Sequence, residues 1–269
     1  MTLSVVMVTY NCADVVEGAL QSVSGLWEEL LVGDAGSTDG TVELVRKHGG
    51  VVIRPMKTKN LGERKQELVE KAKGDWILVL DADERVSPKL FQEIKSIIHS
   101  PRRSHALRLR SGLPPSEVIN PVAYRIPYQN YVFGRPVYYG GEKYAKVRLF
   151  RRGMATISPE PLHEEIRVIG PTSLKLRGVK EIGEIRGKIH HHSYRSPWQL
   201  FGKFTRYAWV ASGMTSDVTL RKLFLYGPHM FWARFVKEKG YKDGWRGFVL
   251  AGAFGYMEVL TYWFLLFLR

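Results

Sequence analysis

The chain has a single cysteine, Cys12, so an intramolecular disulfide is excluded. A lone thiol suits a reducing compartment, where structural disulfides are rare. The N-terminus, Met-Thr-Leu-Ser-Val-Val-Met-Val, has no basic segment and only a short apolar run. It therefore indicates a first β-strand rather than a secretion signal, and we expect the protein to stay in the cytoplasm. Internal repeats and low-complexity segments are also missing, which is typical of an ordinary folded protein.

Acidic residues are scarce, with 26 Asp and Glu against 40 Lys and Arg, and the net charge of +14 implies an anionic partner. Ten Lys and Arg against three Asp and Glu lie between Arg195 and Arg246, so +7 of this excess falls in that stretch. Four tryptophans share it, and an apolar tail follows. Cations mixed with interfacial aromatics predict a membrane surface, whereas the apolar tail argues against nucleic acid.

The apolar tail, Phe248–Leu268, is long enough to cross a bilayer, but Glu258 lies near its centre. An acid at that depth is costly unless it is shielded. We therefore favour a helix that lies in the membrane interface or packs on the domain. A spanning helix and a plain core helix are the alternatives. The expected location is peripheral, at the cytoplasmic face of the cell membrane.

Strand and helix patterns alternate along the first hundred residues. Such alternation predicts a mostly parallel sheet with helices on both faces, whose ligands bind at the carboxyl ends of the strands. The expected strands are Leu3–Val8, Glu29–Val32, Val51–Arg54 and Trp76–Leu80. The expected helices are Ala13–Val23, Thr41–His48 and Gly62–Lys73.

From Pro101 the composition changes, beginning with a basic stretch at Arg102–Arg110. Further strands are expected at Lys146–Phe150 and Ile185–His191. Helices are expected from Ser196, with breaks near Gly213, Gly227-Pro228 and Gly240–Gly244. We expect three parts, at 1–105, 106–195 and 196–269, of which the last is a helical membrane-associated region.

Two carboxylates, Asp81 and Asp83, follow the apolar strand that ends at Leu80. They are separated by one residue, so strand alternation would point both the same way. Such a pair can hold Mg²⁺ or Mn²⁺ while the cation bridges a diphosphate. A solvated turn with helix-capping acids is the alternative.

Two other predicted strand ends carry polar groups. Thr9-Tyr10-Asn11 follows the first strand, and the loop Asp34–Thr41 follows the second and opens a helix. A helix N-terminus favours anions, and the glycines of the loop permit tight turns. An ordinary loop, with Asp39 or Thr41 as the N-cap, is the alternative. Together the three strand ends describe a nucleotide-diphosphate pocket.

These motifs resemble the family-2 glycosyltransferases with the GT-A fold. Later segments resemble the branch that includes the lipopolysaccharide-core β-glucosyltransferases, and the likeness covers nearly the whole chain. The segments that carry the branch resemblance are Leu61–Gln66, Asp75–Leu78, Asn130–Arg135, Gly140-Gly141, Arg148–Gly153, Leu162-His163-Glu164, His191–Tyr194 and Asp243–Phe248.

The resemblance implies a nucleotide-sugar-binding half at 1–105 and an acceptor-binding half at 106–195. It also implies roles for single residues. The implied nucleotide-binding residues are Thr9, Tyr10, Asn11, Asp34, Lys65 and Asp81. The implied metal ligands are Asp83, Asp81 and His191, since a late histidine often serves the metal or the diphosphate. Neighbouring histidines alternate faces on a strand, so His190–His192 cannot all reach one site. Glu164 matches the catalytic base, and Glu165 is the alternative. For each of these residues an ordinary packed or solvated side chain is the other interpretation.

The aromatic and glycine-rich segment Tyr124–Tyr144, including Tyr139, is expected at the acceptor site, with Arg135, Arg151 or Arg152 meeting phosphates. The predicted function is inverting transfer of a hexose from a nucleotide diphosphate sugar, with UDP as the expected nucleotide, to a membrane-anchored glycan or glycolipid. A polyprenyl-phosphate acceptor and a non-catalytic glycan- or membrane-binding scaffold are the competing hypotheses.

Overall fold

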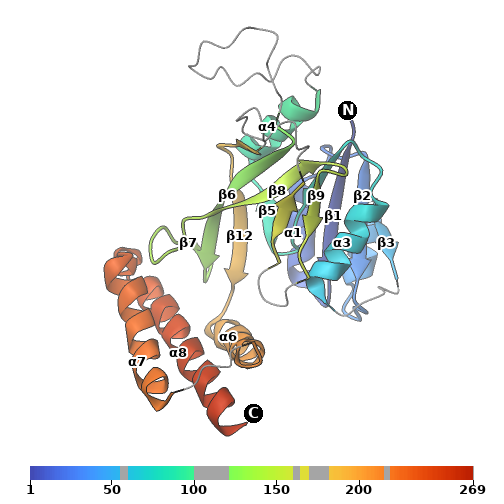
Figure 1. The fold of residues 1–269 in the computed structure, drawn as a ribbon. Coiled ribbons are helices and arrows are strands. Elements are labelled where there is room, and N and C mark those ends of the chain that lie inside the picture. Colours follow the sequence, from blue (N-terminus) through green and yellow to red (C-terminus); the bar gives the residue numbers. More distant parts are fainter. Residues whose placement is uncertain (55–59, 100–120, 160–163, 170–181, 215–218, 269) are drawn as a thin grey trace. The chain divides into compact units, whose positions relative to one another are not determined.

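The computed structural model describes residues 1–54, 60–99, 121–159, 164–169, 182–214 and 219–268 (Figure 1). The chain forms two compact units. Unit 1 holds Met1–Pro127 and Ala145–Ile189, and unit 2 holds Tyr128–Tyr144 and His190–Arg269. The second segment of unit 2 begins at His190, so the border expected near residue 195 lies a few residues after the observed one. The basic stretch Arg102–Arg110 and the residues Leu162-His163 lie outside the described residues.

Unit 1 is built on four parallel strands in the order β3-β2-β1-β4. These strands are β1 (Leu3–Thr9), β2 (Glu29–Asp34), β3 (Val51–Ile53) and β4 (Trp76–Val79). The helices between them are α1 (Ala13–Ser22), α2 (Thr41–Lys47) and α3 (Leu61–Lys71). The alternation predicted for this part is confirmed, with ends shifted by no more than two residues. β1 and β4 are buried almost throughout, as continuous apolar strands inside a parallel sheet should be.

The sheet becomes mixed beyond β4. Strand β8 (Ala145–Arg151) runs antiparallel to β4, and β6 (Ala123–Val132) runs antiparallel to β8. The described part of unit 1 also contains β5 (Glu84–Val86), α4 (Pro88–His99), β9 (Ala155–Ile157), β10 (Ile166–Val168) and β11 (Ile182–Glu184). The expectation of a mostly parallel sheet thus holds for the four N-terminal strands, and the fold is a mixed α/β sheet with flanking helices.

The strand expected at Ile185–His191 is displaced, because β12 begins only at Ile189 and ends at Tyr194. The backbone N–H groups of Arg186 and Gly187 donate to Glu93 Oε2 of α4, at 3.1 and 2.8 Å, instead of to a strand. A Cβ on Gly187 would lie 2.3 Å from the Leu90 backbone, so this close approach to α4 requires glycine. Contact with α4 therefore interrupts the predicted strand.

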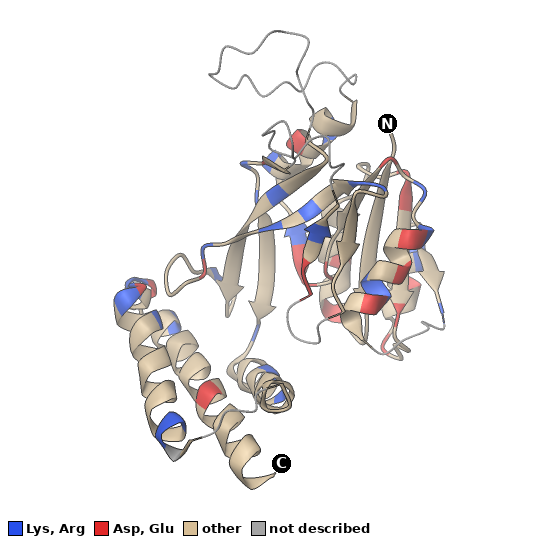
Figure 2. Ribbon diagram, in the orientation of Figure 1, with Lys and Arg blue, Asp and Glu red and all other residues tan. Residues whose placement is uncertain are grey.

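Unit 2 combines the later part of β6, β7 (Arg135–Pro136) and β12 with a set of helices. The helices are α6 (Pro197–Ser212), α7 (Leu220–Trp232), the π-helix η2 (Ala233–Lys237), the 3₁₀-helix η3 (Gly240–Asp243) and α8 (Trp245–Phe267). α7 and α8 lie side by side, and α6 also packs on α8 (Figures 1 and 2). An apolar core joins Val132 and Val137 to Leu200, Phe204 and Leu250.

Two of the three expected helix breaks are confirmed, at Gly213 and at Gly240–Gly244. The break expected at Gly227-Pro228 is wrong, because α7 continues through both residues. A Cβ on Gly227 would lie 2.4 Å from Val259 Cγ2 and 3.0 Å from the Gly255 carbonyl oxygen. Gly227 therefore serves close packing of α7 against α8, as small residues do where helix backbones approach.

Candidate active site

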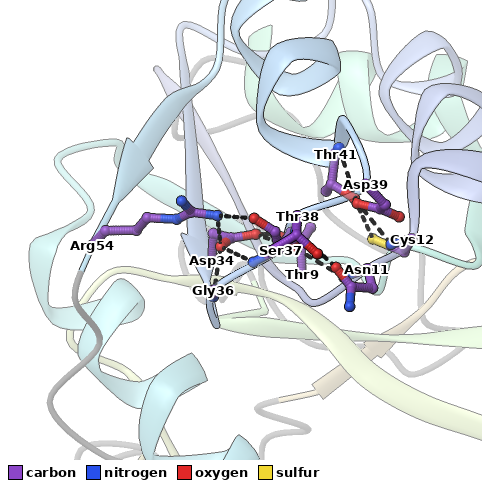
Figure 3. A network of polar contacts seen from close by, with 10 residues as sticks. All are labelled: Thr9, Asn11, Cys12, Asp34, Gly36, Ser37, Thr38, Asp39, Thr41 and Arg54. Carbon is purple, nitrogen blue, oxygen red and sulfur yellow. Dashed lines mark hydrogen bonds and ion pairs between the residues drawn. The ribbon is translucent and has the colours of Figure 1, made fainter.

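The ends of β1 and β2 carry a dense polar network in unit 1, centred on Asp34 (Figure 3). Asp34 Oδ2 accepts hydrogen bonds from the backbone N–H groups of Gly36 and Ser37 at 2.7 and 2.8 Å. Asp34 Oδ1 accepts from the Thr9 hydroxyl at 3.1 Å and the Ser37 hydroxyl at 2.5 Å. The guanidinium of Arg54, just after β3, also pairs with Asp34. The carboxylate is thereby fixed in one orientation.

Asp34 is ionised in this setting. Burial by itself would raise its pKa, but the hydrogen bonds from Ser37, Gly36 and Arg54 outweigh that effect and lower it below its ordinary value. The Asp34 side chain is fully buried, and its two oxygens already accept from five donors, so a ligand N–H or hydroxyl could bond to it only after Arg54 or Ser37 moves.

The rest of the loop ties two helices together. Asp39 Oδ2 accepts from the Ala13 N–H at 3.0 Å, and Asp39 Oδ1 accepts from the Thr41 hydroxyl at 2.5 Å. Asp39 thus contacts the first residue of both α1 and α2, but the N-cap of α2 is Gly40, so the expectation of Asp39 or Thr41 as the N-cap is wrong. Asn11, which has a positive φ of 43°, accepts from the Thr38 N–H at 2.9 Å. Tyr10 is exposed beside it, with its ring open to a ligand.

A second cluster follows the end of β4. Lys65 Nζ lies 2.6 Å from Asp81 Oδ1, and Arg148 Nη2 lies 3.0 Å from Asp81 Oδ2. The same arginine nitrogen lies 3.1 Å from Glu84 Oε1, while Glu84 Oε2 accepts from the Asp81 N–H at 2.9 Å. Lys65, Glu84 and Arg148 are buried, and Asp81 is half-buried. Burial, the largest single effect, lowers the pKa of Lys65, but the charges of Asp81 and Glu164 and the hydrogen bond to Asp81 together raise it above its ordinary value, so the lysine stays charged.

Glu164 also belongs to this cluster, because its Oε1 lies 2.5 Å from Lys65 Nζ. Its position follows from the packing of α3. The N-cap Asn60 donates to the Pro159 carbonyl at 2.6 Å, and a Cβ on Gly62 would lie 2.2 Å from the Ser158 carbonyl oxygen. Ser158 in turn bonds the Glu165 backbone in both directions. Glu165 itself is exposed and lies 3.9 Å from Arg167, so of the two glutamates only Glu164 reaches the cluster.

A divalent cation fits this site only in part. Asp83 is a half-buried carboxylate in the turn after Asp81 and is of the right chemical kind. Both oxygens of Asp81, however, pair with cationic side chains, so an ion could use Asp81 only after Lys65 or Arg148 moves. Within the described residues, no group of three or more His, Cys, Asp or Glu could hold a metal ion.

His191 lies in unit 2, where its Nδ1 is 3.0 Å from Asn130 Oδ1 and 2.8 Å from the Ser193 hydroxyl. Asn130 also donates to the buried Glu142 at 2.7 Å. His190 and His192 instead lie against the ring of Tyr131. The predicted alternation of the three histidines is therefore observed, and His191 belongs to a hydrogen-bonded network of unit 2.

The proposed acceptor residues are spread over the chain. Arg135 is exposed on β7. The Tyr139 N–H donates to Asp243 at 2.8 Å, and Lys143 and Lys242 lie over its ring. Arg151 pairs with Trp76 at the start of β4 and stacks on its ring, and the N–H of Arg152 bonds the Asp75 carbonyl.

Arg151 and Arg152 thus lie at the opposite end of β4 from Asp81. The structure does not bring them to the carboxylates. Sequence reasoning missed Arg148, which does reach Asp81, and Arg54, which reaches Asp34. The sequence feature that could have identified Arg148 is its position as a charged residue among the apolar residues of Val147–Phe150. The feature that could have identified Arg54 is its position directly after the apolar residues of β3.

Comparisons with known proteins agree with the sequence motifs. An uncharacterized glycosyltransferase of Rickettsia bellii is 36% identical over 108 residues, which cover 39% of this chain and 35% of the relative. An uncharacterized glycosyltransferase of Mycoplasma genitalium is 31% identical over 112 residues, covering 33% of this chain and 34% of the relative. The chain therefore spans about a third of the length of these curated relatives.

Among solved structures, glucosyl-3-phosphoglycerate synthase from Mycobacterium tuberculosis, in complex with Mn²⁺, uridine diphosphate and phosphoglyceric acid, is 29% identical. The match covers 31% of this chain and 34% of that chain, with a TM-score of 0.28. Mannosyl-3-phosphoglycerate synthase from Rubrobacter xylanophilus is 27% identical over 38% of each chain, with a TM-score of 0.33. Both TM-scores are too low to bear on the ligands of this chain.

The family assignment rests on a longer match. Residues 4–153, more than half of the chain, match the family model described as Glycosyl transferase family 2. This range contains the polar ends of β1 and β2 and the cluster of Lys65, Asp81 and Arg148. The mixed sheet with flanking helices agrees with the predicted GT-A fold. The chain belongs to glycosyl transferase family 2.

Proposed function

We propose that this chain transfers a hexose from a nucleotide diphosphate sugar, with a UDP-sugar as the first candidate, to a hydroxyl group of a membrane-anchored glycan. A lipopolysaccharide core or another glycolipid is the acceptor class that the branch resemblance favours. The observation that carries the proposal is the gathering of Thr9, Asp34 and Asp81 at the carboxyl ends of adjacent strands, inside the family-2 match. Ligands of such sheets bind at that edge.

The network around Asp34 suits the nucleoside. Asp34 is held by Thr9, Ser37 and Arg54, so a nucleoside that displaced Arg54 would meet a carboxylate already fixed in orientation. The exposed ring of Tyr10 offers a stacking face for a base or sugar. The Lys65 and Arg148 cations lie at the next strand end, where a diphosphate would need positive charge.

Glu164 is the proposed general base. In an inverting displacement it takes the proton of the acceptor hydroxyl while the hydroxyl oxygen bonds to the anomeric carbon. The bond from that carbon to the diphosphate oxygen breaks, and the nucleoside diphosphate leaves with the electron pair. Lys65 pairs with Glu164 and orients its carboxylate. A bound Mg²⁺ or Mn²⁺, for which Asp83 is the candidate ligand, would neutralise the leaving diphosphate.

The Lys65–Glu164 ion pair also favours a second candidate, transfer to polyprenyl phosphate. A carboxylate engaged by an ammonium is less available to remove a proton, and a phosphate acceptor is already ionised and needs little base catalysis. Glu164→Gln separates the two functions. The hydroxyl-acceptor enzyme should lose most of its turnover, whereas the phosphate-acceptor enzyme should keep it.

The first experiment is a thermal-shift screen of nucleotide sugars, with and without Mn²⁺, because a ligand that binds the folded state raises its stability. One donor class should stabilise the full chain, and Asp34→Asn should reduce that shift. Glu165→Gln, which changes an exposed glutamate outside the cluster, is the matched control and should leave the shift intact. A protein that no nucleotide sugar stabilises, with or without the cation, would be a scaffold rather than a transferase.

A further inference from the structure

The helices of unit 2 leave large apolar side chains on the surface. Phe224 on α7 is 70% exposed, and Phe267 near the end of α8 is 61% exposed. Trp232, Trp245 and Phe248 are each more than half exposed around the turn between the two helices. Soluble monomers rarely expose so many large apolar groups on neighbouring elements. These side chains indicate a surface that contacts something apolar.

The length and burial of α8 argue against a simple core helix. α8 has 23 residues, and its most apolar 18-residue window has a mean hydropathy of 1.5, yet only 33% of that window is buried. A core helix of that hydropathy would be covered on most sides. The other arm is α7 continued by η2, 13 and 5 residues and at most about 27 Å in length, and it carries Arg221, Lys222, Arg234 and Lys237, whereas a bilayer core is about 30 Å thick and apolar. The two helices α7 and α8 therefore fit a position in the membrane interface better than a hairpin that spans the bilayer.

The charges of this region complement an anionic surface. Residues Arg195–Arg246 carry ten Lys and Arg against three Asp and Glu. On α7 and α8 the charged side chains gather near the helix ends, with Glu258 as the exception inside α8 (Figure 2). Lys237, Lys239 and Lys242 lie in the connection between Trp232, the last residue of α7, and Trp245, the first residue of α8. Cations beside interfacial tryptophans are the combination that binds anionic headgroups.

We propose that the helical hairpin, residues 220–267, lies in the interface of an anionic lipid bilayer, with its exposed rings among the acyl chains and its turn lysines at the headgroups. The hairpin then anchors the enzyme without crossing the membrane. This inference deepens the proposed function by naming the surface on which a lipid-linked acceptor is met. Its test needs no sugar donor, so binding and transfer can fail separately.

The experiment is flotation of the full chain with phosphatidylcholine vesicles that contain or lack phosphatidylglycerol. The protein should float with the anionic vesicles, and high salt should release only part of it, because apolar burial is not screened. Lys237→Gln/Lys242→Gln should weaken binding about thirtyfold at low salt, at about 1 kcal/mol for each lysine. Lys89→Gln/Lys95→Gln, which removes two exposed lysines from α4, is the charge-matched control and should bind as the wild type.

A second variant tests the apolar contribution. Phe224→Ser/Phe267→Ser removes two exposed rings and should leave binding that high salt abolishes completely. Circular dichroism confirms that each variant is folded. Equal affinity for neutral and anionic vesicles, or no flotation by the folded wild type, would overturn the proposal. A dimer in light scattering that the phenylalanine variant dissociates, together with no flotation, would assign the surface to a second copy of the chain.

Discussion

The structure gives its most specific prediction for the effect of replacing Arg148. It is 5% exposed and bridges Asp81 and Glu84 through one guanidinium nitrogen. Arg148→Met keeps an apolar stem of similar length but removes the ion pair from Glu84, which is 1% exposed. Breaking a buried pair by removing one partner costs about 3–5 kcal/mol, because a buried charge loses its compensation.

We expect the lower end of that range. Asp81 keeps its pair with Lys65, and Lys146 lies close enough for Glu84 and Asp81 to affect its pKa. A loss of about 3 kcal/mol in the free energy of unfolding corresponds to a fall in Tm of roughly 9 °C for a chain of this size. Urea denaturation and calorimetry measure both quantities.

Glu84→Gln supplies the decisive comparison. The amide keeps an oxygen that can accept from the Asp81 N–H but carries no charge to compensate. The double variant Arg148→Met/Glu84→Gln should therefore recover at least half of the stability lost in Arg148→Met. Arg152→Met, at an exposed arginine just after β8, is the control and should cost less than about 0.5 kcal/mol. A loss below about 1 kcal/mol for Arg148→Met, or a double variant as unstable as the single one, refutes the reasoning.

Three further predictions concern the site. Asp83→Asn should leave the fold intact and abolish transfer in Mg²⁺ or Mn²⁺, so near-normal turnover would remove Asp83 from the metal site. Glu164→Gln should lower turnover by roughly 10²–10⁴-fold with little change in donor affinity. A larger loss of turnover from Glu165→Gln than from Glu164→Gln would assign the general base to Glu165. Hydrogen bonds hold the pKa of Asp34 below its ordinary value of 3.8, so its contribution to stability is present above that pH and is lost as pH falls through the lowered value. Urea midpoints should fall in acid, and Asp34→Asn should flatten that slope.

Much of the fold could be predicted because its signals are local. The apolar runs that became β1 and β4, and the periodic helices between the strands, depend on neighbouring residues. The place of Asp34 and Thr9 at one edge followed from parallel pairing, which puts the carboxyl ends of the strands together. The same reasoning found Asp81 and Asp83 without any knowledge of their partners.

The partners themselves are decided by tertiary contacts. Lys65 and Glu164 are 99 residues apart, and only the packing of α3 on Ser158 and Pro159 brings them together. Arg148 and Arg151 lie on one strand, and the register of β8 against β4 decides which of them reaches Asp81. In the same way, Gly227 and Pro228 carry a helix-breaking signal that packing against α8 overrides. A local apolar pattern specifies which face of a strand is buried. It does not identify which residue of a distant strand or helix lies opposite.

The cluster around Lys65 explains how one site can hold several acids before a donor binds. Asp81, Glu84 and Glu164 would repel one another, and Lys65 and Arg148 offset most of that charge. A diphosphate brings new negative charge and competes with Asp81 and Glu164 for the same cations. If Lys65 turns toward the diphosphate, Glu164 is released at the moment when an acceptor proton has to be removed. Donor binding would then activate the base. On this reasoning, Glu164→Gln should lower turnover strongly, because the glutamate acts in the chemical step after Lys65 has left it. The same change should not weaken donor binding, because it removes a competitor for Lys65.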